Sequence, residues 1–540
     1  MTVSEAEEKA AANAEGMLLS WWASKGPDRP ALFTAYGDRS YGELNANVNR
    51  LVRALRNRGL VAGDSVALMC TNRPEFLEVL FAAQRGGFRL TPINWHLTGE
   101  EAAYIVENCE AKAFFASAEV GDKVIAAAQG GDARMVRVTT GGMVPGFEKY
   151  NELVAAEEGS DIADPVLGTQ MLYTSGTTGR PKGVHREGAA PSALATVNFC
   201  GYDEDWANSV DAHLCTGPLY HAAPLAFSVA VPLLYGVPIV IMEQWDPVET
   251  LRLVAQHGIT HTHMVPTMFH RMLALPEEVR VRHDVSSLRY VIHGAAPCPV
   301  SVKQQLIEWL GPIVVEYYAA TEGLGTLVDS ATWLTRPGTV GRPMVHGLVK
   351  VMTVDESGVA GDEAAAGEIG LVYLRAVAST KFDYYGDDEK TAGAFRGDYF
   401  TLGDMGYMDA DGFLFLTDRT ANLIISGGVN IYPAEVDAVL LQHPAVGDVA
   451  TIGVPDEEWG EAVKAVVQLA EGVTASPELA EELRQFCREH LAHFKCPRTV
   501  DFVAQLPRED TGKIYKRKLR DEYRAAANTN EERGRPRGNL

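Results

Sequence analysis

Two hydrophobic patterns alternate along the N-terminal part of the chain. Short apolar, β-branched runs, such as 66–70 and 237–242, predict buried strands. Between such runs, segments such as 74–83 and 247–257 are amphipathic at helical spacing, which predicts helices. A further strand is expected over 289–293. Strands that alternate with helices favour mostly parallel, helix-flanked sheets, so we expect an α/β fold.

The pattern changes from about Gly367. The segments 368–375 and 412–417 are typical of antiparallel strands joined by Asp and Gly turns. After Arg419, a small α+β pattern of three strands and two helices fills 423–490. Because 540 residues exceed one hydrophobic core, we expect a large domain with helix-flanked sheets and a small β-barrel-like part, followed by a separate small α+β domain. The predicted boundaries are 1–418 for the large domain, 419–527 for the small domain and 528–540 for a polar, disordered tail.

The net charge of the chain limits the classes of partner that it is expected to bind. The 71 acidic residues outnumber the 48 basic residues, which leaves a formal net charge of −23. Nucleic-acid binding needs clustered basic side chains to neutralise phosphates, so we expect no nucleic-acid partner. An anionic small molecule stays compatible with this charge if its site is locally basic, and the acidic surface favours solubility.

Targeting and membrane signals are weak in this sequence. Residues 4–15 are acidic and alanine-rich, unlike a secretory signal. The most apolar run, 229–242, is short and is interrupted by two prolines and a glycine, so we expect no transmembrane segment. Seven scattered cysteines without a CxxC pair fit a reduced compartment, and we expect a cytoplasmic protein. Peripheral membrane contact and a homodimer stay open.

A loop over 173–183 carries the most specific chemistry. It contains three glycines, four Ser or Thr hydroxyls, an arginine and a lysine. Glycines let backbone N–H groups approach closely, hydroxyls donate to phosphate oxygens, and the cations offset charge, so the loop predicts a polyphosphate site. Lys182 is followed by Gly183, which excludes a Walker loop. The alternative is a flexible linker, and the buried strand predicted over 168–173 argues against it.

Three charged side chains elsewhere fit the same chemistry. Glu322 follows the β-branched run 313–315, and an acid just past a strand end suits Mg²⁺ held together with nucleotide phosphates. Asp404 lies in a turn where a carboxylate can accept both ribose hydroxyls. Lys513 follows a glycine in the loop 506–513. Taken singly, each has an ordinary alternative, namely a solvated glutamate, a turn aspartate and a surface lysine.

In this order, these motifs resemble those of the adenylate-forming superfamily, which includes acyl-CoA synthetases, the adenylation domains of peptide synthetases and beetle luciferases. The resemblance runs from about Trp21 to Arg520 and is closest to the acyl-CoA synthetase branch. It implies an acid–thiol ligase that uses ATP, Mg²⁺ and, as a substrate, CoA. A small-molecule carboxylate first reacts with ATP to give an acyl-adenylate and pyrophosphate. The CoA thiol then attacks the adenylate and releases AMP, after a swing of the small domain.

The resemblance also implies residue roles. Lys513, Thr321 and Glu322 are the expected catalytic residues, and Glu322 is the expected Mg²⁺ ligand. Gly427 is expected beside the pantetheine arm of CoA. The predicted ATP- and AMP-binding residues are Thr174, Ser175, Gly176, Thr177, Thr178, Gly179, Lys182, Gly294, Ala295, Ala296, Tyr317, Tyr318, Ala319, Thr321, Asp404 and Arg419. The predicted CoA-binding residues are Gly427, Gly428 and Trp459, and structural packing is an equal alternative for Trp459.

The chain departs from the superfamily at three positions. Ala421 stands where relatives usually carry an Asp or Lys at the domain hinge, which leaves the hinge open. His221 stands where amino-acid-activating relatives carry an Asp, which argues against an amino-acid substrate. His221 is assigned to a tunnel gate or, nearly equally, to core packing. Ala319 replaces a frequent glycine and is expected to shorten the substrate pocket.

The predicted acyl pocket is apolar and has small side chains. Its members are Tyr220, His221, Ala223, Phe227 and Ala319. This lining predicts a hydrophobic carboxylate, first a medium- or long-chain fatty acid and second a steroid-ring or aromatic acid. Two other function classes are alternatives. A phosphotransferase would release ADP and leave Lys513 unused, and an inactive acyl-binding protein would lack catalytic residues that are present here.

Three histidines suggest a metal site at first sight. His261 and His263 lie in a strand-like segment, and His270 lies on the next predicted helix. No carboxylate or cysteine completes a ligand set, so we expect no metal there.

Overall fold

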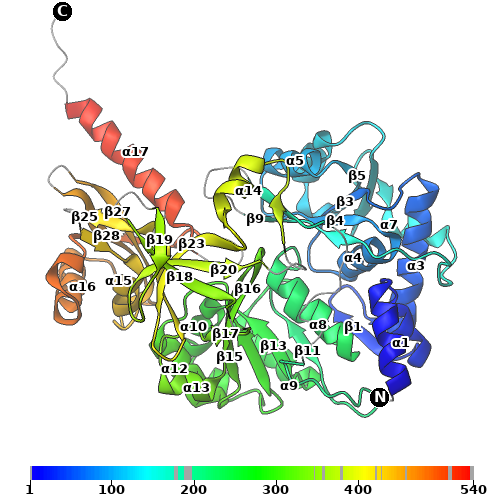
Figure 1. Ribbon diagram of the computed structural model, residues 1–540, viewed down its shortest axis with the longest axis horizontal. Coiled ribbons are helices and arrows are strands. Elements are labelled where there is room, and N and C mark those ends of the chain that lie inside the picture. The colour runs from blue at the N-terminus through cyan, green and yellow to red at the C-terminus, as the bar shows by residue number, and fades with distance from the viewer. Residues whose placement is uncertain are drawn as a thin grey trace, which may run out of the picture.

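The computed structural model describes residues 3–174, 181–187, 198–345, 347–355, 359–376, 381–419, 422–426, 429–456, 459–508 and 514–534 (Figure 1). Within these ranges, two mostly parallel sheets with helices on their faces form the larger part of the molecule. Two antiparallel sheets follow, and a mixed sheet forms the small C-terminal part. This arrangement confirms the predicted fold class.

The first parallel sheet contains six strands in the order β7-β6-β5-β3-β4-β8, and all neighbours run parallel. Its strands are β3 (Ser65–Met69), β4 (Arg89–Pro92), β5 (Ala111–Ser117), β6 (Val136–Thr140), β7 (Glu148–Lys149) and β8 (Thr169–Gln170). Its helices are α3 (Tyr41–Asn57), α4 (Pro74–Gly86), α5 (Gly99–Asn108), α6 (Asp122–Ala127) and α7 (Tyr150–Ala155). Helix α3 begins at a capping box of Ser40 and Glu43, and it buries Leu44, Val48 and Leu51 at helical spacing.

The second sheet contains nine strands in the order β17-β16-β15-β14-β13-β11-β12-β1-β2, parallel in its centre and antiparallel at both edges. Its strands are β1 (Pro30–Thr34), β2 (Arg39–Ser40), β11 (His213–Cys215), β12 (Ile239–Ile241), β13 (His261–Met264), β14 (Tyr290–His293), β15 (Val314–Ala320), β16 (Gly323–Val328) and β17 (Arg342–Pro343). The accompanying helices are α1 (Val3–Ala14), α2 (Leu18–Lys25), π-helix η4 (Pro224–Ala230), α8 (Val231–Tyr235), α9 (Pro247–His257), α10 (Pro266–Leu273), α11 (Glu277–Arg280), α12 (Val300–Leu310) and α13 (Ser330–Thr335).

The antiparallel part consists of a six-stranded and a three-stranded sheet. The larger contains β18 (Val349–Val354), β19 (Ala360–Glu363), β20 (Gly370–Arg375), β22 (Phe395–Arg396), β23 (Tyr399–Met408) and β24 (Leu414–Arg419). The smaller contains β9 (Leu172–Thr174), β10 (Lys182–His185) and β21 (Asp383–Tyr384), and helix α14 (Asp388–Ala394) follows β21. The antiparallel strands predicted beyond Gly367 are therefore confirmed.

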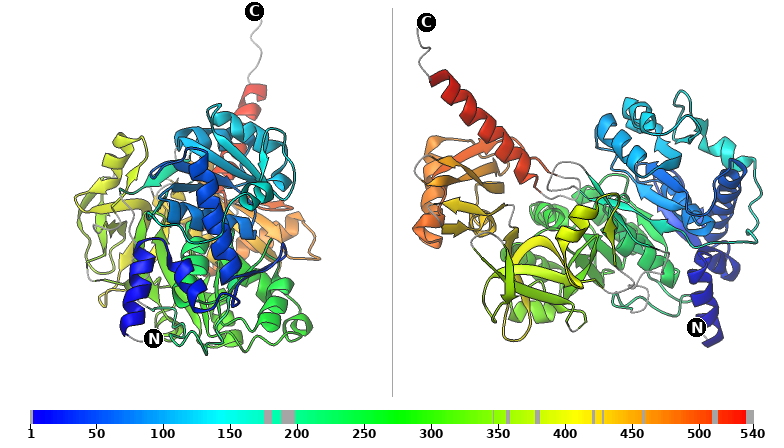
Figure 2. Two further views of the ribbon diagram at one scale, coloured as in Figure 1. Left: turned by 90° about the vertical axis from the view of Figure 1, so that its right-hand side faces the viewer. Right: turned by 45° about the horizontal axis from the view of Figure 1, so that its top comes forward.

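The C-terminal part is built on a sheet of five strands, β25 (Ile424–Ser426), β26 (Val429–Ile431), β27 (Val446–Asp456), β28 (Gly460–Leu469) and β29 (Thr499–Val503). Its helices are α15 (Pro433–Leu440), α16 (Pro477–His490) and α17 (Lys516–Gly534), and α17 projects away from the body (Figures 1 and 2). His270 of α10 donates from Nε2 to the backbone oxygen of Gly447 in β27 at 2.8 Å, so the two parts are in contact. The predicted boundaries at 418 and 527 stay predictions.

Local signals explain the helices that the sequence predicts best. Helix α9 begins after the N-cap Asp246, whose side chain accepts from Glu249 N, and it ends at Gly258 with a left-handed φ of 59°. Helix α16 begins in the same way, with Ser476 as N-cap and Pro477 in its first turn.

The strand predicted over 168–173 is divided between two sheets. Thr169 and Gln170 form β8 and pair with β4, whereas Leu172–Thr174 form β9 and pair with β10. The Gly-rich segment consequently joins two strands of an antiparallel hairpin, not a parallel strand and a helix. Hydrophobicity alone does not show this change of partner, because Met171 between the two strands is fully buried.

Two further features follow from burial. All seven cysteines are free, and six of them are buried as small apolar side chains. In the part of the chain that the structure describes, no helix has both the length and the hydrophobicity needed to cross a membrane.

Candidate functional site

The hairpin of β9 and β10 places Thr174 directly opposite Lys182. The Lys182 Nζ lies 3.4 Å from the Asp387 Oδ2 and 6.0 Å from the centroid of the Tyr384 ring. The side chain is therefore fixed at the root of the Gly-rich loop. The other predicted phosphate-binding positions, Ser175, Gly176, Thr177, Thr178 and Gly179, lie outside the described residues.

Thr321 and Glu322 form the turn between β15 and β16, just past a strand end as expected. The Glu322 carboxyl is 5% exposed, and the Tyr384 hydroxyl donates to its Oε1 at 3.1 Å. Arg186 donates from Nη2 to the backbone oxygens of Thr321 at 2.7 Å and Glu322 at 3.2 Å. Burial raises the pKa of Glu322, and the hydrogen bond from Tyr384 and the charge of Arg186 oppose this shift.

This turn fits a magnesium ion. Mg²⁺ in nucleotide sites is usually held by one or two carboxylates together with substrate phosphates. Glu322 supplies a buried carboxylate, and the Tyr384 hydroxyl donates to its Oε1. Glu322 and the phosphates would hold the ion, which would neutralise phosphate charge when bound.

A second cluster joins Tyr318, Asp404 and Arg419. Asp404 of β23 and Arg419 of β24 are paired in register, and Arg419 Nε donates to Asp404 Oδ1 at 2.8 Å. The Tyr318 hydroxyl donates to Asp404 Oδ2 at 2.8 Å. Burial and the Asp404 charge raise the pKa of Tyr318, so its hydroxyl stays protonated and can donate. Three of the predicted ATP- and AMP-binding residues are thus brought together from three strands.

The turn after β14 contains Gly294, Ala295 and Ala296. Ala295 has φ of 68°, a left-handed conformation that costs a non-glycine residue about 1–2 kcal/mol. Gly294 is required by close packing, because a Cβ there would lie 2.6 Å from the Tyr317 ring and 2.7 Å from its backbone oxygen. Strained backbone of this kind persists where surrounding structure determines it, often at ligand sites.

Gly294→Val is therefore expected to destabilise the protein by about 1–3 kcal/mol, because Tyr317 and its strand must move. Thermal unfolding and the KM for ATP measure the effect. The matched control is Gly393→Ala, since a Cβ there meets nothing within 4 Å and the residue lies inside a helix. The control is expected to be neutral or stabilising by about 1 kcal/mol. Equal stability of the two variants would contradict the packing argument.

An apolar cluster lies beside this turn. Phe227 of η4 stacks on His263 with an interplanar angle of 8°, and its ring lies 4.6 Å from that of Tyr317. The His263 Nε2 and the Tyr317 hydroxyl are hydrogen bonded at 3.0 Å. The half-buried residues packed on the cluster are Phe199, Ala223, Ala226, Tyr290, Ala319 and Leu327. The structure thus brings together three predicted pocket residues, Ala223, Phe227 and Ala319.

Two further predicted site residues pack against apolar neighbours. The side chain of Tyr317, a predicted nucleotide residue, belongs to this apolar cluster, whereas its neighbour Tyr318 faces Asp404, since successive side chains on a strand point to opposite faces. Tyr220, a predicted acyl-pocket residue, is 5% exposed and packs against the large N-terminal core. Its ring lies 4.6 Å from that of His221.

The three histidines considered for a metal face different partners. His261 Nε2 contacts the backbone oxygen of Cys200 at 3.0 Å, and His263 Nε2 contacts the Tyr317 hydroxyl. His270 contacts Gly447, as described above. Burial lowers the pKa of His263 to about 3, so its ring is neutral at physiological pH and serves the apolar cluster.

The C-terminal part presents Trp459 on its surface. This indole is 41% exposed, and the Arg498 guanidinium lies 5.1 Å from its ring centroid. Core packing therefore does not account for Trp459. The predicted positions Gly427, Gly428 and Lys513, and the hinge position Ala421, lie outside the described residues. The flanking residues Arg508 and Ile514 pair in an antiparallel bridge.

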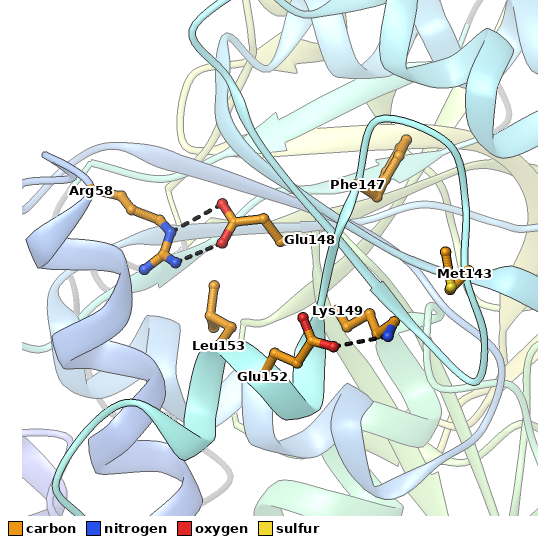
Figure 3. A pocket seen from close by; sticks show the side chains of 7 residues that line it. All are labelled: Arg58, Met143, Phe147, Glu148, Lys149, Glu152 and Leu153. Atoms are coloured by element: carbon orange, nitrogen blue, oxygen red, sulfur yellow. Dashed lines mark hydrogen bonds and ion pairs between the residues drawn. The ribbon is translucent and has the colours of Figure 1, made fainter.

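A separate hollow of about 400 Å³ lies between α3 and the β7–α7 segment (Figure 3). Its charged groups are paired with one another, Arg58 with Glu148 at 2.6 Å and Lys149 with Glu152 at 2.8 Å. None of the predicted site residues lines it. This hollow is therefore not a candidate for the active site.

No sequence pattern points to Arg186 or Tyr384, although both donate hydrogen bonds to the turn that contains Glu322. Arg186 lies 135 residues from Thr321 and Tyr384 lies 62 residues from Glu322 in the chain. The only local signal is the position of Arg186 just after β10.

Comparison with known proteins agrees with this geometry. The family model described as AMP-binding enzyme matches residues 19–378, and the model for the AMP-binding enzyme C-terminal domain matches residues 435–513. A 2-succinylbenzoate–CoA ligase from Geobacillus kaustophilus is 33% identical over 498 residues, which cover 92% of this chain and 95% of the relative. A long-chain-fatty-acid–CoA ligase from Mycobacterium tuberculosis is 32% identical over 502 residues, which cover 90% and 93%.

A solved structure of an anthranilate CoA ligase in complex with anthranoyl-AMP aligns with a TM-score of 0.83. Its sequence identity is 26%, and the alignment covers 95% of this chain and 98% of that one. The predicted resemblance and the predicted enzyme class, an AMP-forming acid–thiol ligase, are thereby confirmed. The chain belongs to the AMP-binding enzyme family, a branch of the adenylate-forming superfamily.

Proposed function

We propose that this ligase activates a hydrophobic, ring-bearing carboxylic acid of compact size, such as an aromatic acid. The reaction converts carboxylate, ATP and CoA into acyl-CoA, AMP and pyrophosphate through an acyl-adenylate. The observation that carries the substrate proposal is the aromatic wall of Phe227, His263 and Tyr317. Flat rings favour stacked or edge-on neighbours, and such pairs contribute about 0.5–1.5 kcal/mol beyond area burial.

A medium- or long-chain fatty acid is the second candidate. It is supported by the small side chains of Ala223, Ala226 and Ala319 around the same cluster. The relatives are divided in the same way, since their names include an aromatic acid and a long-chain fatty acid.

The proposed residue roles follow the geometry of the site. Thr174 and Lys182 bind the β- and γ-phosphates, and Glu322 holds Mg²⁺ beside them. Asp404, oriented by Tyr318 and Arg419, accepts the ribose hydroxyls. The carboxylate attacks the α-phosphorus in line, so positioning and charge neutralisation supply most of the catalysis.

The second half-reaction needs a path for CoA. We assign this path to Gly427 and Gly428, with the exposed Trp459 as a surface for the pantetheine arm. Lys513 neutralises charge in the first half-reaction and is replaced by CoA in the second, after a swing of the small domain.

Pyrophosphate release tests the proposal directly. The panel contains benzoate- and cinnamate-type acids, steroid-ring acids and fatty acids of increasing length, each with and without CoA. The expected result is the highest kcat/KM for an aromatic acid. A monotonic rise of kcat/KM with fatty-acid chain length would favour the second candidate instead.

Phe227→Leu separates the two candidates within one pocket. The variant keeps an apolar side chain but removes the ring. We expect kcat/KM to fall about tenfold for aromatic acids and to change little for fatty acids, because only the aromatic substrate loses a ring–ring contact. Equal losses for both substrate types would show that the ring of Phe227 has no part in selection.

A further inference from the structure

Lys390 of α14 lies beside the phosphate-binding hairpin, although no sequence motif points to it. Its Nζ is 4.8 Å from the centroid of the Tyr384 ring, and the Nζ of Lys182 is 6.0 Å from the same centroid. The hydroxyl of that ring donates to the Glu322 carboxylate at 3.1 Å. Two ammonium groups and the proposed Mg²⁺ ligand therefore surround one tyrosine.

The fold fixes Lys390 in this place. Asp387 is the N-cap of α14, and its Oδ1 accepts the backbone N–H of Lys390 at 3.0 Å. The other oxygen of Asp387 lies 3.4 Å from Lys182 Nζ. One carboxylate thus positions the helix that carries Lys390 and also contacts Lys182. Strand β21, which precedes the helix, pairs with β10 and ties both lysines to the same small sheet.

Two ammonium groups, of Lys182 and Lys390, and two carboxylates, of Asp387 and Glu322, lie close together at this place. Burial and the neighbouring Lys182 lower the pKa of Lys390 to about 8, and Asp387 and Glu322 oppose this shift. Two cations held this close repel each other. A ligand with several negative charges relieves the repulsion, and a bound Mg²⁺ at Glu322 would remove the compensation that this carboxylate provides.

We propose that Lys390 binds the pyrophosphate part of ATP together with Lys182 and stabilises the pyrophosphate that leaves. This inference rests on the proposed adenylation reaction. In that step a carboxylate oxygen forms a bond to the α-phosphorus, and the bond between the α-phosphorus and the bridging oxygen to the β-phosphate breaks. The electron pair stays on that oxygen, so negative charge grows on the group next to Lys390, where a fixed cation stabilises it.

The test uses the full-length enzyme with Lys390→Met and Lys390→Arg. We expect Lys390→Met to raise the KM for ATP and the inhibition constant for added inorganic pyrophosphate about tenfold each, with a lower rate of adenylation. Thioester formation from pre-made acyl-adenylate involves no pyrophosphate and is expected to keep its rate. Lys390→Arg is expected to restore most of the pyrophosphate affinity, because the charge is kept.

Lys381→Met is the matched control, since Lys381 is an exposed lysine nine residues earlier in the chain. It is expected to match the wild type in every assay, and thermal unfolding reports whether the Lys390 variants are folded. Unchanged pyrophosphate inhibition in Lys390→Met would overturn the inference, as would an equal loss in the thioester half-reaction. A wild-type enzyme that releases no AMP with any acid would instead contradict the proposed function.

Discussion

Replacing Lys513 by alanine is expected to slow acyl-adenylate formation by about 10²–10³-fold, while thioester formation from pre-made acyl-adenylate keeps most of its rate. An ammonium aimed at the charge that develops between carboxylate and α-phosphate acts only in the first half-reaction. Single-turnover pyrophosphate release measures this step, and thioester formation from the isolated adenylate measures the second.

The control for this variant is Lys518→Ala, because Lys518 is an exposed lysine of α17 close by in the chain. It is expected to leave both half-reactions unchanged. If Lys513→Ala reduced both half-reactions equally, the division of labour between Lys513 and the CoA path would be wrong.

Glu322→Gln is expected to reduce adenylation by about 10²-fold and to raise the Mg²⁺ concentration needed for half-maximal rate. The substitution keeps the shape of the side chain and an oxygen that can accept from Tyr384, but it removes the charge that Mg²⁺ requires. Adenylation rates over a Mg²⁺ titration, at saturating ATP, measure both effects.

Tyr384→Phe separates the charge of Glu322 from its orientation. This variant keeps the carboxylate and removes only the hydroxyl that donates to it, a loss that corresponds to about 0.5–1.5 kcal/mol. We therefore expect a reduction of about tenfold or less. A Glu322→Gln enzyme with normal rate and normal Mg²⁺ dependence would exclude Glu322 as the metal ligand.

The sequence predicts those elements best whose ends are determined locally. Helix α9 has its predicted bounds, because an N-cap, a proline in the first turn and the apolar spacing all lie in or next to the helix segment itself. The strand over 168–173 is wrong as a single element, because its two halves pair with strands far apart in the chain. Strand pairing is a tertiary property that local hydrophobicity does not encode.

The same distinction applies to the site. The motifs predict Glu322, Asp404 and Tyr318 as site residues, and the structure brings Asp404 and Tyr318 into contact. The sequence does not point to Arg186 or Lys390, because their roles depend on contacts that form only in the folded protein. Arg186 contacts Thr321, which is far away in the chain, and Lys390 contacts the ring of Tyr384 beside Glu322. A motif also does not show which face of a strand each residue occupies, so only the structure shows that Tyr317 and Tyr318 face different neighbours.

The transfer of oxygen from the acid to AMP tests the central claim most directly. The enzyme is incubated with ATP, Mg²⁺, CoA and the best acid of the panel, labelled with ¹⁸O in both carboxylate oxygens. An acyl-adenylate route predicts one ¹⁸O atom in the AMP that is released, because the carboxylate oxygen that attacks phosphorus remains bonded to it. Unlabelled AMP, or ¹⁸O in inorganic phosphate with ADP as the nucleotide product, would contradict the account.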